Sequence, residues 1–129
     1  MERIFKNLIL LDLAIFILAM VSIFFIPEEI ESISDTLDYG LLSNINEMYI
    51  LLAFAVIVIA YLINLILLYR FIRFGKNLYL FIFVITIILS LLMGPIIQTS
   101  FEYTMNYLSG TVGGAILILL YFSPIKDKF

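Results

Sequence analysis

A run of twenty residues from Asn7 to Ile26 is strongly apolar, and Asp12 is its one ionisable residue. A helix rises about 1.5 Å per residue, so this run forms a helix roughly 30 Å long, which matches the hydrocarbon core of a bilayer. A carboxyl group inside such a helix must be neutral, paired, turned toward protein or able to reach the interface. The fold of the chain therefore has to provide Asp12 with one of these environments.

The composition of the whole chain agrees with a membrane location for this helix. Of the 129 residues, 64% are hydrophobic and 13% are charged, whereas soluble domains are about half apolar. The length fits a single membrane domain over residues 1–129. Because cysteine and histidine are absent, the sequence offers no disulfide, thiol chemistry or imidazole ligand. We therefore expect an all-α integral membrane protein without a cofactor.

Three further segments have the length and apolar character of membrane-spanning helices, namely residues 49–69, 78–97 and 101–122. The clearly apolar run 108–122 is too short to span a bilayer by itself. A start near residue 101 gives sufficient length, because Thr99 or Ser100 can cap such a helix and Glu102 is favourable in its first turn. With residues 7–26, these segments predict a four-transmembrane-helix bundle.

The segment 27–47 between the first two apolar runs is the only extended polar stretch. Pro27 followed by two glutamates is typical of a helix start, and Ile30, Ile33 and Leu37 fall on one face. We therefore predict a short amphipathic helix in this loop. Its acidic residues are Glu28, Glu29, Glu31, Asp35 and Asp38. They form either a surface for a cation or basic partner or, as we expect, a solvated helix face, because the spacing of a calcium loop is absent.

The basic residues predict the orientation of the helices. All seven lie before residue 7, in the loop 70–76 or in the tail 123–129: Arg3, Lys6, Arg70, Arg73, Lys76, Lys126 and Lys128. Four spans put these three segments on one side, and the positive-inside rule assigns that side to the cytoplasm. We expect a multi-pass cell-membrane protein with both termini in the cytoplasm and the acidic loop outside.

Tyrosines near the ends of the predicted spans agree with this arrangement, because aromatic side chains are favoured at the membrane interface. They are Tyr49, Tyr69, Tyr79, Tyr103, Tyr107 and Tyr121. We expect these side chains to mark the edges of the bilayer.

Asp12, Asn64 and Tyr121 form a candidate polar layer near the cytoplasmic edge. Asp12 lies six residues after Lys6, and Asn64 lies six residues before Arg70, so both are about 9 Å inside that edge. If the first two spans pack as a hairpin, Asp12 and Asn64 can hydrogen-bond directly. We favour a structural role for this pair, because a single carboxyl group with no second acid or histidine makes a poor proton relay. In the other interpretation, Asp12 exchanges a proton for a cation or cationic substrate at the inner face.

Small residues gather on the last span. Gly110 and Gly114 form a GxxxG pattern, and Gly113 pairs with Ser109 one position behind. Such residues allow a neighbouring helix to approach closely, and that helix belongs either to the same bundle, which we favour slightly, or to a second copy. Gly94 and Pro95 predict the end of the third span before an outer turn.

The residue inventory favours a non-enzymatic role, with no catalytic or metal site. Membrane hydrolases and transferases need clustered acids, a serine with a base, or histidines, and we find none of these arrangements in the sequence. We expect an accessory, assembly or interaction subunit whose partners are the bilayer and, through residues 101–122, a second copy or another membrane protein. A nucleic-acid partner is not expected. The alternative is a small proton- or cation-coupled transporter that uses Asp12 as its titrating carboxyl group.

Overall fold

The computed structural model describes residues 1–34, 45–92 and 96–129, and no β-strand occurs in these ranges. The described elements follow the chain in the order α1 (Glu2–Ser22), the 3₁₀ turn η1 (Ile23–Phe25), α2 (Glu28–Ser34), α3 (Glu47–Tyr69), α4 (Arg73–Leu92), α5 (Ser100–Phe122) and the 3₁₀ segment η3 (Pro124–Lys128). Among them, α1, α3, α4 and α5 are long and apolar enough to cross a membrane. The prediction of an all-α fold with four such helices is therefore confirmed.

The largest differences from the predicted helix boundaries are in α1 and α4. The helix α4 ends at Leu92 rather than at residue 97, and Gly94 and Pro95, where the third span was predicted to end, lie outside the described residues. The first helix begins at Glu2 rather than at residue 7 and becomes 3₁₀ at Ile23. The third long helix begins at Arg73 rather than at residue 78, so the predicted basic loop 70–76 shortens to a tight turn. The two earlier starts have the same cause, since charged and polar residues at the N-terminal end of an apolar run continue the helix instead of interrupting it.

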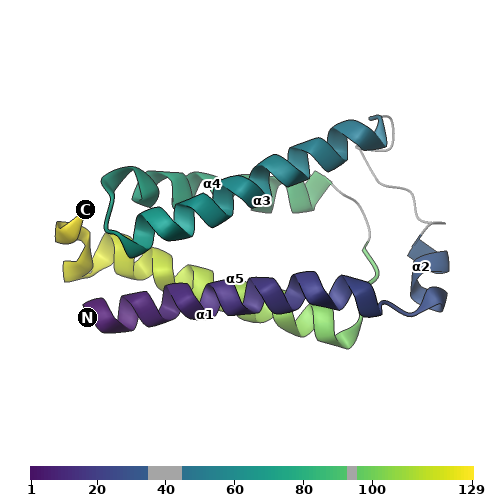
Figure 1. Ribbon diagram of the computed structural model, residues 1–129, viewed down its shortest axis with the longest axis horizontal. Helices are drawn as coiled ribbons and strands as arrows, with labels where there is room; N and C mark the ends of the chain where they lie inside the picture. The colour runs from purple at the N-terminus through teal and green to yellow at the C-terminus, as the bar shows by residue number, and fades with distance from the viewer. Residues whose placement is uncertain (35–44, 93–95) are drawn as a thin grey trace.

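The four long helices form two antiparallel pairs, with α3 beside α4 and α1 beside α5 (Figure 1). The pairs converge where the two termini lie and separate toward α2 (Figure 1). The expected hairpin between the first two spans is therefore not the main pairing of α1. A long connection joins α1 to α3, whereas a turn of a few residues joins α3 to α4 and holds those two helices together.

The turn between α3 and α4 depends on Phe71 and Gly75. Phe71 has a positive φ of 57°, and the backbone N–H of Ile72 donates to the carbonyl group of Leu67 over 2.9 Å. Gly75 lies in the first turn of α4, where a Cβ atom would come within 2.8 Å of the Cβ atom of Leu67. The glycine that the sequence places in a loop therefore serves the close approach of two helices.

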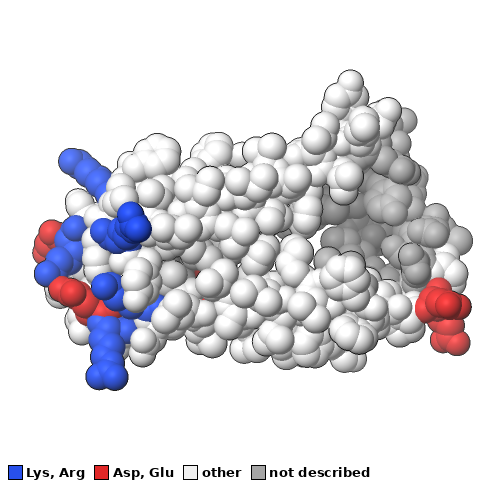
Figure 2. Space-filling model, in the orientation of Figure 1, with Lys and Arg blue, Asp and Glu red and all other residues white. Residues whose placement is uncertain are grey.

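The charged side chains divide between the two ends of the molecule. Lys and Arg gather at one end, and acidic side chains over α2 lie at the opposite end (Figure 2). We call the first of these the basic end; its residues are Arg3, Lys6, Arg70, Arg73, Lys76, Lys126 and Lys128. The helix expected after Pro27 is present as α2, whereas Leu37, Asp35 and Asp38 lie outside the described residues. The amphipathic character of the segment stays a prediction.

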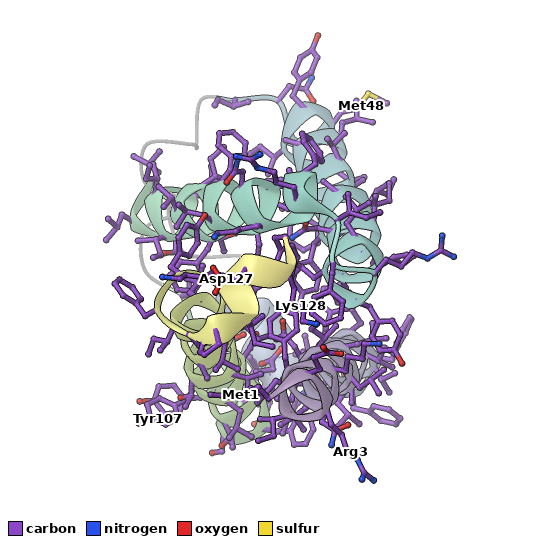
Figure 3. All side chains as sticks on the ribbon, turned by 90° about the vertical axis from the view of Figure 1, so that its left-hand side faces the viewer. Met1, Arg3, Met48, Tyr107, Asp127 and Lys128 are labelled. Carbon is purple, nitrogen blue, oxygen red and sulfur yellow. The ribbon has the colours of Figure 1, made fainter. Side chains whose placement is uncertain are left out.

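The most tightly packed part of the core lies near the basic end. The largest fully buried apolar side chains are Phe5, Leu68, Ile116, Leu120 and Ile125. The segment η3 lies across this end of the bundle, with Lys128 near its centre and Arg3 pointing away (Figure 3). The ring of Phe129 packs against those of Phe5 and Phe71, at centroid distances of 5.9 and 5.4 Å. The C-terminal residues therefore close the basic end.

The start of α5 forms as the sequence predicts. The hydroxyl group of Thr99 accepts from the backbone N–H of Glu102 over 3.1 Å, and the carboxylate of Glu102 accepts from the backbone N–H of Thr99 over 2.8 Å. This reciprocal capping box satisfies two donors that a helix start otherwise leaves unpaired. Of the two predicted candidates, Thr99 and Ser100, the structure has Thr99 as the cap, and the prediction of Glu102 in the first turn is confirmed.

Candidate binding pocket around Asp12

Asp12 lies inside the bundle, with only 1% of its surface exposed. Its Oδ2 atom accepts hydrogen bonds from the hydroxyl groups of Tyr61, over 2.7 Å, and Tyr79, over 3.2 Å. Within the described residues, no hydrogen bond reaches Oδ1. The three side chains come from α1, α3 and α4, so this polar cluster links helices that belong to both pairs.

Helical spacing explains why these side chains meet. On α3, Tyr61 lies four and seven residues before the buried Leu65 and Leu68, so all three share one face. On α1, Phe16 follows Asp12 by four residues and packs its ring against that of Tyr61 at a centroid distance of 5.1 Å. The apolar neighbours thus fix the tyrosine ring and direct its hydroxyl group toward the carboxyl group.

Asn64 is fully buried but bonds to the backbone of α4 instead of to Asp12. With its amide group oriented to suit its neighbours, Nδ2 donates to the carbonyl oxygen of Gly75 over 2.8 Å and Oδ1 accepts from the N–H of Tyr79 over 3.2 Å. These two backbone groups are one helical turn apart. The direct hydrogen bond between Asp12 and Asn64, which was possible if the first two spans paired, is therefore not the contact that Asn64 makes, because α3 packs on α4 and Gly75 leaves the backbone of α4 accessible to the amide.

Tyr121 lies closer to the basic end and does not join Asp12. Its hydroxyl group donates to the backbone carbonyl of Lys76 over 3.4 Å, and Nζ of Lys76 lies 4.6 Å from the centroid of its ring. The expected layer of Asp12, Asn64 and Tyr121 is thus divided among three separate sets of contacts. Tyr61 and Tyr79, which complete the environment of Asp12, were not predicted as its partners.

A pocket of about 400 Å³ adjoins Asp12 and receives side chains from all four long helices. Asp12, Tyr61 and Tyr79 supply its ionisable groups, and aromatic rings and small residues of the helices form much of the remaining wall. The phenylalanine and glycine residues of the wall are Phe16, Phe54, Phe83, Gly110 and Gly113. Because Phe16 follows Asp12 and Phe54 precedes Tyr61, the pocket extends from the carboxyl group toward the α2 end. The buried core lies on the other side of Asp12.

The glycines of α5 have different surroundings. A Cβ atom at Gly113 would lie 3.3 Å from the hydroxyl oxygen of Tyr79 and 3.5 Å from the ring of Phe83, so this glycine makes room for α4. At Gly110 and Gly114, a Cβ atom would meet no described atom within 4 Å. Gly110 lines the pocket, whereas Gly114 does not appear among its lining residues. The small-residue pattern therefore serves a helix contact at Gly113 and leaves open space at the other two positions.

The pocket offers one carboxyl group in otherwise neutral surroundings. Its other polar side chains among the described residues are hydroxyl and amide groups: Tyr61, Tyr79, Thr86, Asn106 and Ser109. No group of three acidic, histidine or cysteine side chains that would hold a metal ion occurs in the part of the chain that the structure describes. Such a site can accept one proton or pair with one positive charge.

No protein-family model, curated protein or solved structure matches this chain. Its function must therefore be inferred from the pocket, from the side chains that line it and from the distribution of charge.

Proposed function

We propose that α1, α3, α4 and α5 cross the cell membrane, with the basic end in the cytoplasm. The gathering of lysine and arginine at one end of four apolar helices supports this orientation, because cytoplasmic segments carry an excess of these residues. Both termini then lie in the cytoplasm, and α2 lies on the outer side. In this orientation, the pocket extends from Asp12 toward the outer face.

Within the membrane, we propose that the chain acts as a small, non-enzymatic proton- or cation-coupled transporter with Asp12 as its titrating carboxyl group. The observation that carries this proposal is that Asp12 is 1% exposed and lines a pocket of about 400 Å³. Pockets of this size accommodate small molecules, and ionisable groups inside a membrane commonly belong to ion or proton pathways. A carboxyl group that only joined two helices would not need a pocket beside it.

A second candidate is an accessory, assembly or interaction subunit. Gly114 supports it, since a Cβ atom there would meet no described atom, and another membrane helix is able to approach α5 closely at this point. In this role, the bonds from Tyr61 and Tyr79 to Asp12 would serve only to hold the helices together. Such polar contacts inside membranes stabilise by about 1 kcal/mol or less.

Proton flux measurements distinguish the two candidates. The protein is reconstituted into liposomes with a pH gradient and a monovalent organic ammonium ion outside, because a coupled exchanger moves protons only when its partner ion is present. Proton flux is followed with an internal pH indicator for the native chain and for Asp12→Asn. The variant keeps a hydrogen-bond acceptor and removes the titratable group. Asp127→Asn is the matched control, because Asp127 is an exposed acid outside the four long helices. We expect Asp12→Asn alone to abolish the flux; equal flux in the native chain and this variant would overturn the transporter proposal.

A further inference from the structure

The charge of the pocket restricts the ligands that it can hold. Asp12 is the only acidic residue among its described lining residues, and neither lysine nor arginine lines it. An ionised Asp12 therefore contributes a single negative charge to surroundings that are otherwise neutral. Because an unpaired charge in an apolar site is costly, the ligand that fits best carries one positive charge.

The position of the free carboxylate oxygen favours an ammonium group. Both tyrosine hydroxyl groups donate to Oδ2, and Oδ1 has no hydrogen bond within the described residues. A protonated amine has several N–H donors, so it can bond to Oδ1 and to the tyrosine oxygens at the same time. A bare metal ion would require several oxygen ligands at once, whereas much of the pocket wall is carbon.

The aromatic wall indicates the chemical nature of the part of the ligand beyond its charged group. Rings of α1, α3 and α4 surround the space next to the carboxyl group: Phe16, Phe54, Tyr61, Tyr79 and Phe83. Such rings attract a cation within about 6 Å of their centroids and also stack on other aromatic groups. The volume of about 400 Å³ leaves room for a bulky apolar body beyond the charged group.

We propose that the pocket binds lipophilic monovalent amines, with the ammonium group at Asp12 and an aromatic body between the phenylalanine rings. This inference rests on the proposed function, because it names the substrate class of the same site. The ligand enters as a cation, and the proton bound to Asp12 leaves when the cation arrives. The net charge of the pocket is therefore zero both before and after the exchange.

Binding to the full chain in lipid nanodiscs tests this assignment. The probe is 1-naphthylmethylamine, which is protonated at neutral pH, and its neutral counterpart is 1-naphthylmethanol. The anisotropy of naphthyl fluorescence reports binding, with empty nanodiscs correcting for partition into lipid. We expect the native chain to bind the amine at least about tenfold more tightly than the alcohol, and Asp12→Asn to lose this preference. Equal binding of both probes to the native chain would overturn the proposal.

A pocket-filling variant keeps the test decisive if Asp12→Asn fails to fold. Gly110→Leu places a side chain in open space at the pocket wall and leaves the carboxyl group intact. Gly114→Leu is the matched control, because its position is equally open but does not line the pocket. We expect Gly110→Leu to weaken amine binding at least about tenfold and Gly114→Leu to leave it unchanged. Unchanged binding in a folded Gly110→Leu variant would contradict the assignment of the pocket.

The flux and binding measurements can fail independently. Amine binding that depends on Asp12 without any proton flux would support the ligand class and overturn the transport proposal. Proton flux that depends on Asp12, with no preference for the amine, would support transport and overturn the ligand class.

Discussion

The hydroxyl group of Tyr61 lies 2.7 Å from the Oδ2 atom of Asp12, although 49 positions separate the two residues in the chain. This contact joins α3 to α1, which belong to different helix pairs. It provides a buried carboxyl group with a donor to Oδ2, whereas Oδ1 has no hydrogen bond within the described residues. The same geometry is therefore able to hold the bundle together and to present a charge to a ligand.

Replacing Tyr61 with phenylalanine tests how much this hydrogen bond contributes to the stability of the bundle. The substitution removes the hydroxyl group that is closer to Asp12 and keeps the ring that packs on Phe16. We expect the free energy of unfolding to fall by about 1 kcal/mol, measured by denaturant titration in mixed micelles. Tyr107→Phe is the control, since Tyr107 is 69% exposed. An equal effect of the two substitutions would show that the bond to Asp12 adds no stability.

Gly75 provides a test of the close approach between α3 and α4. In Gly75→Ala, the new Cβ atom would meet Cβ of Leu67 at 2.8 Å, so the helices must separate. We expect a loss of about 1–3 kcal/mol in the free energy of unfolding, as is typical of overpacking. Gly114→Ala has no such neighbour, and its better helix propensity should leave stability unchanged or raise it by up to about 1 kcal/mol. Similar losses in both variants would exclude a steric cause.

The four apolar helices and the cap of α5 could be predicted because they depend on residues close together in the sequence. Run length and composition identify the helices, and Thr99 and Glu102 are three positions apart. The partners of Asp12 could not be predicted in this way. They depend on which helices pack together, and apolar side chains distributed around a helix leave that choice open.

One boundary error explains why Tyr79 was assigned to the membrane edge. With a helix start at residue 78, Tyr79 lies in the first turn and resembles an interfacial aromatic residue. The helix in fact starts at Arg73, and Tyr79 is 4% exposed beside Asp12. For Tyr61, a signal was available: it precedes Asn64 by three residues, so both polar side chains share one face of α3.

Lys128 allows a prediction about pH. Its Nζ atom lies 2.7 Å from the Oε1 atom of Glu2, and this hydrogen bond, together with the charge of the carboxylate, raises the pKa of Lys128 above 10.5. Because the folded-state pKa is raised, the contribution of Lys128 to stability is fully present below pH 10.5 and is lost as the pH rises through the folded-state value. Titration of the ¹³Cε resonance should give a higher pKa in the native chain than in Glu2→Gln. Identical values would show that the pair does not form in solution.

The C-terminal Phe129 should control access to the core from the basic end. Its ring contacts Phe5 and Phe71, and each aromatic contact of this kind contributes about 0.5–1.5 kcal/mol, so we expect Phe129→Ala to lower the free energy of unfolding by about 1–2 kcal/mol.

The absence of native cysteine allows accessibility to be measured directly. In an Ile9→Cys background, position 9 is 2% exposed, and a water-soluble thiol reagent should modify it faster once Phe129 is replaced by alanine. Phe122→Ala is the control, because Phe122 is 85% exposed and its loss uncovers no core. If the modification rate were the same in all three proteins, the contacts of Phe129 would not close this end of the bundle. A faster rate in Phe129→Ala alone would show that the ring of Phe129 separates the core from solvent at the basic end.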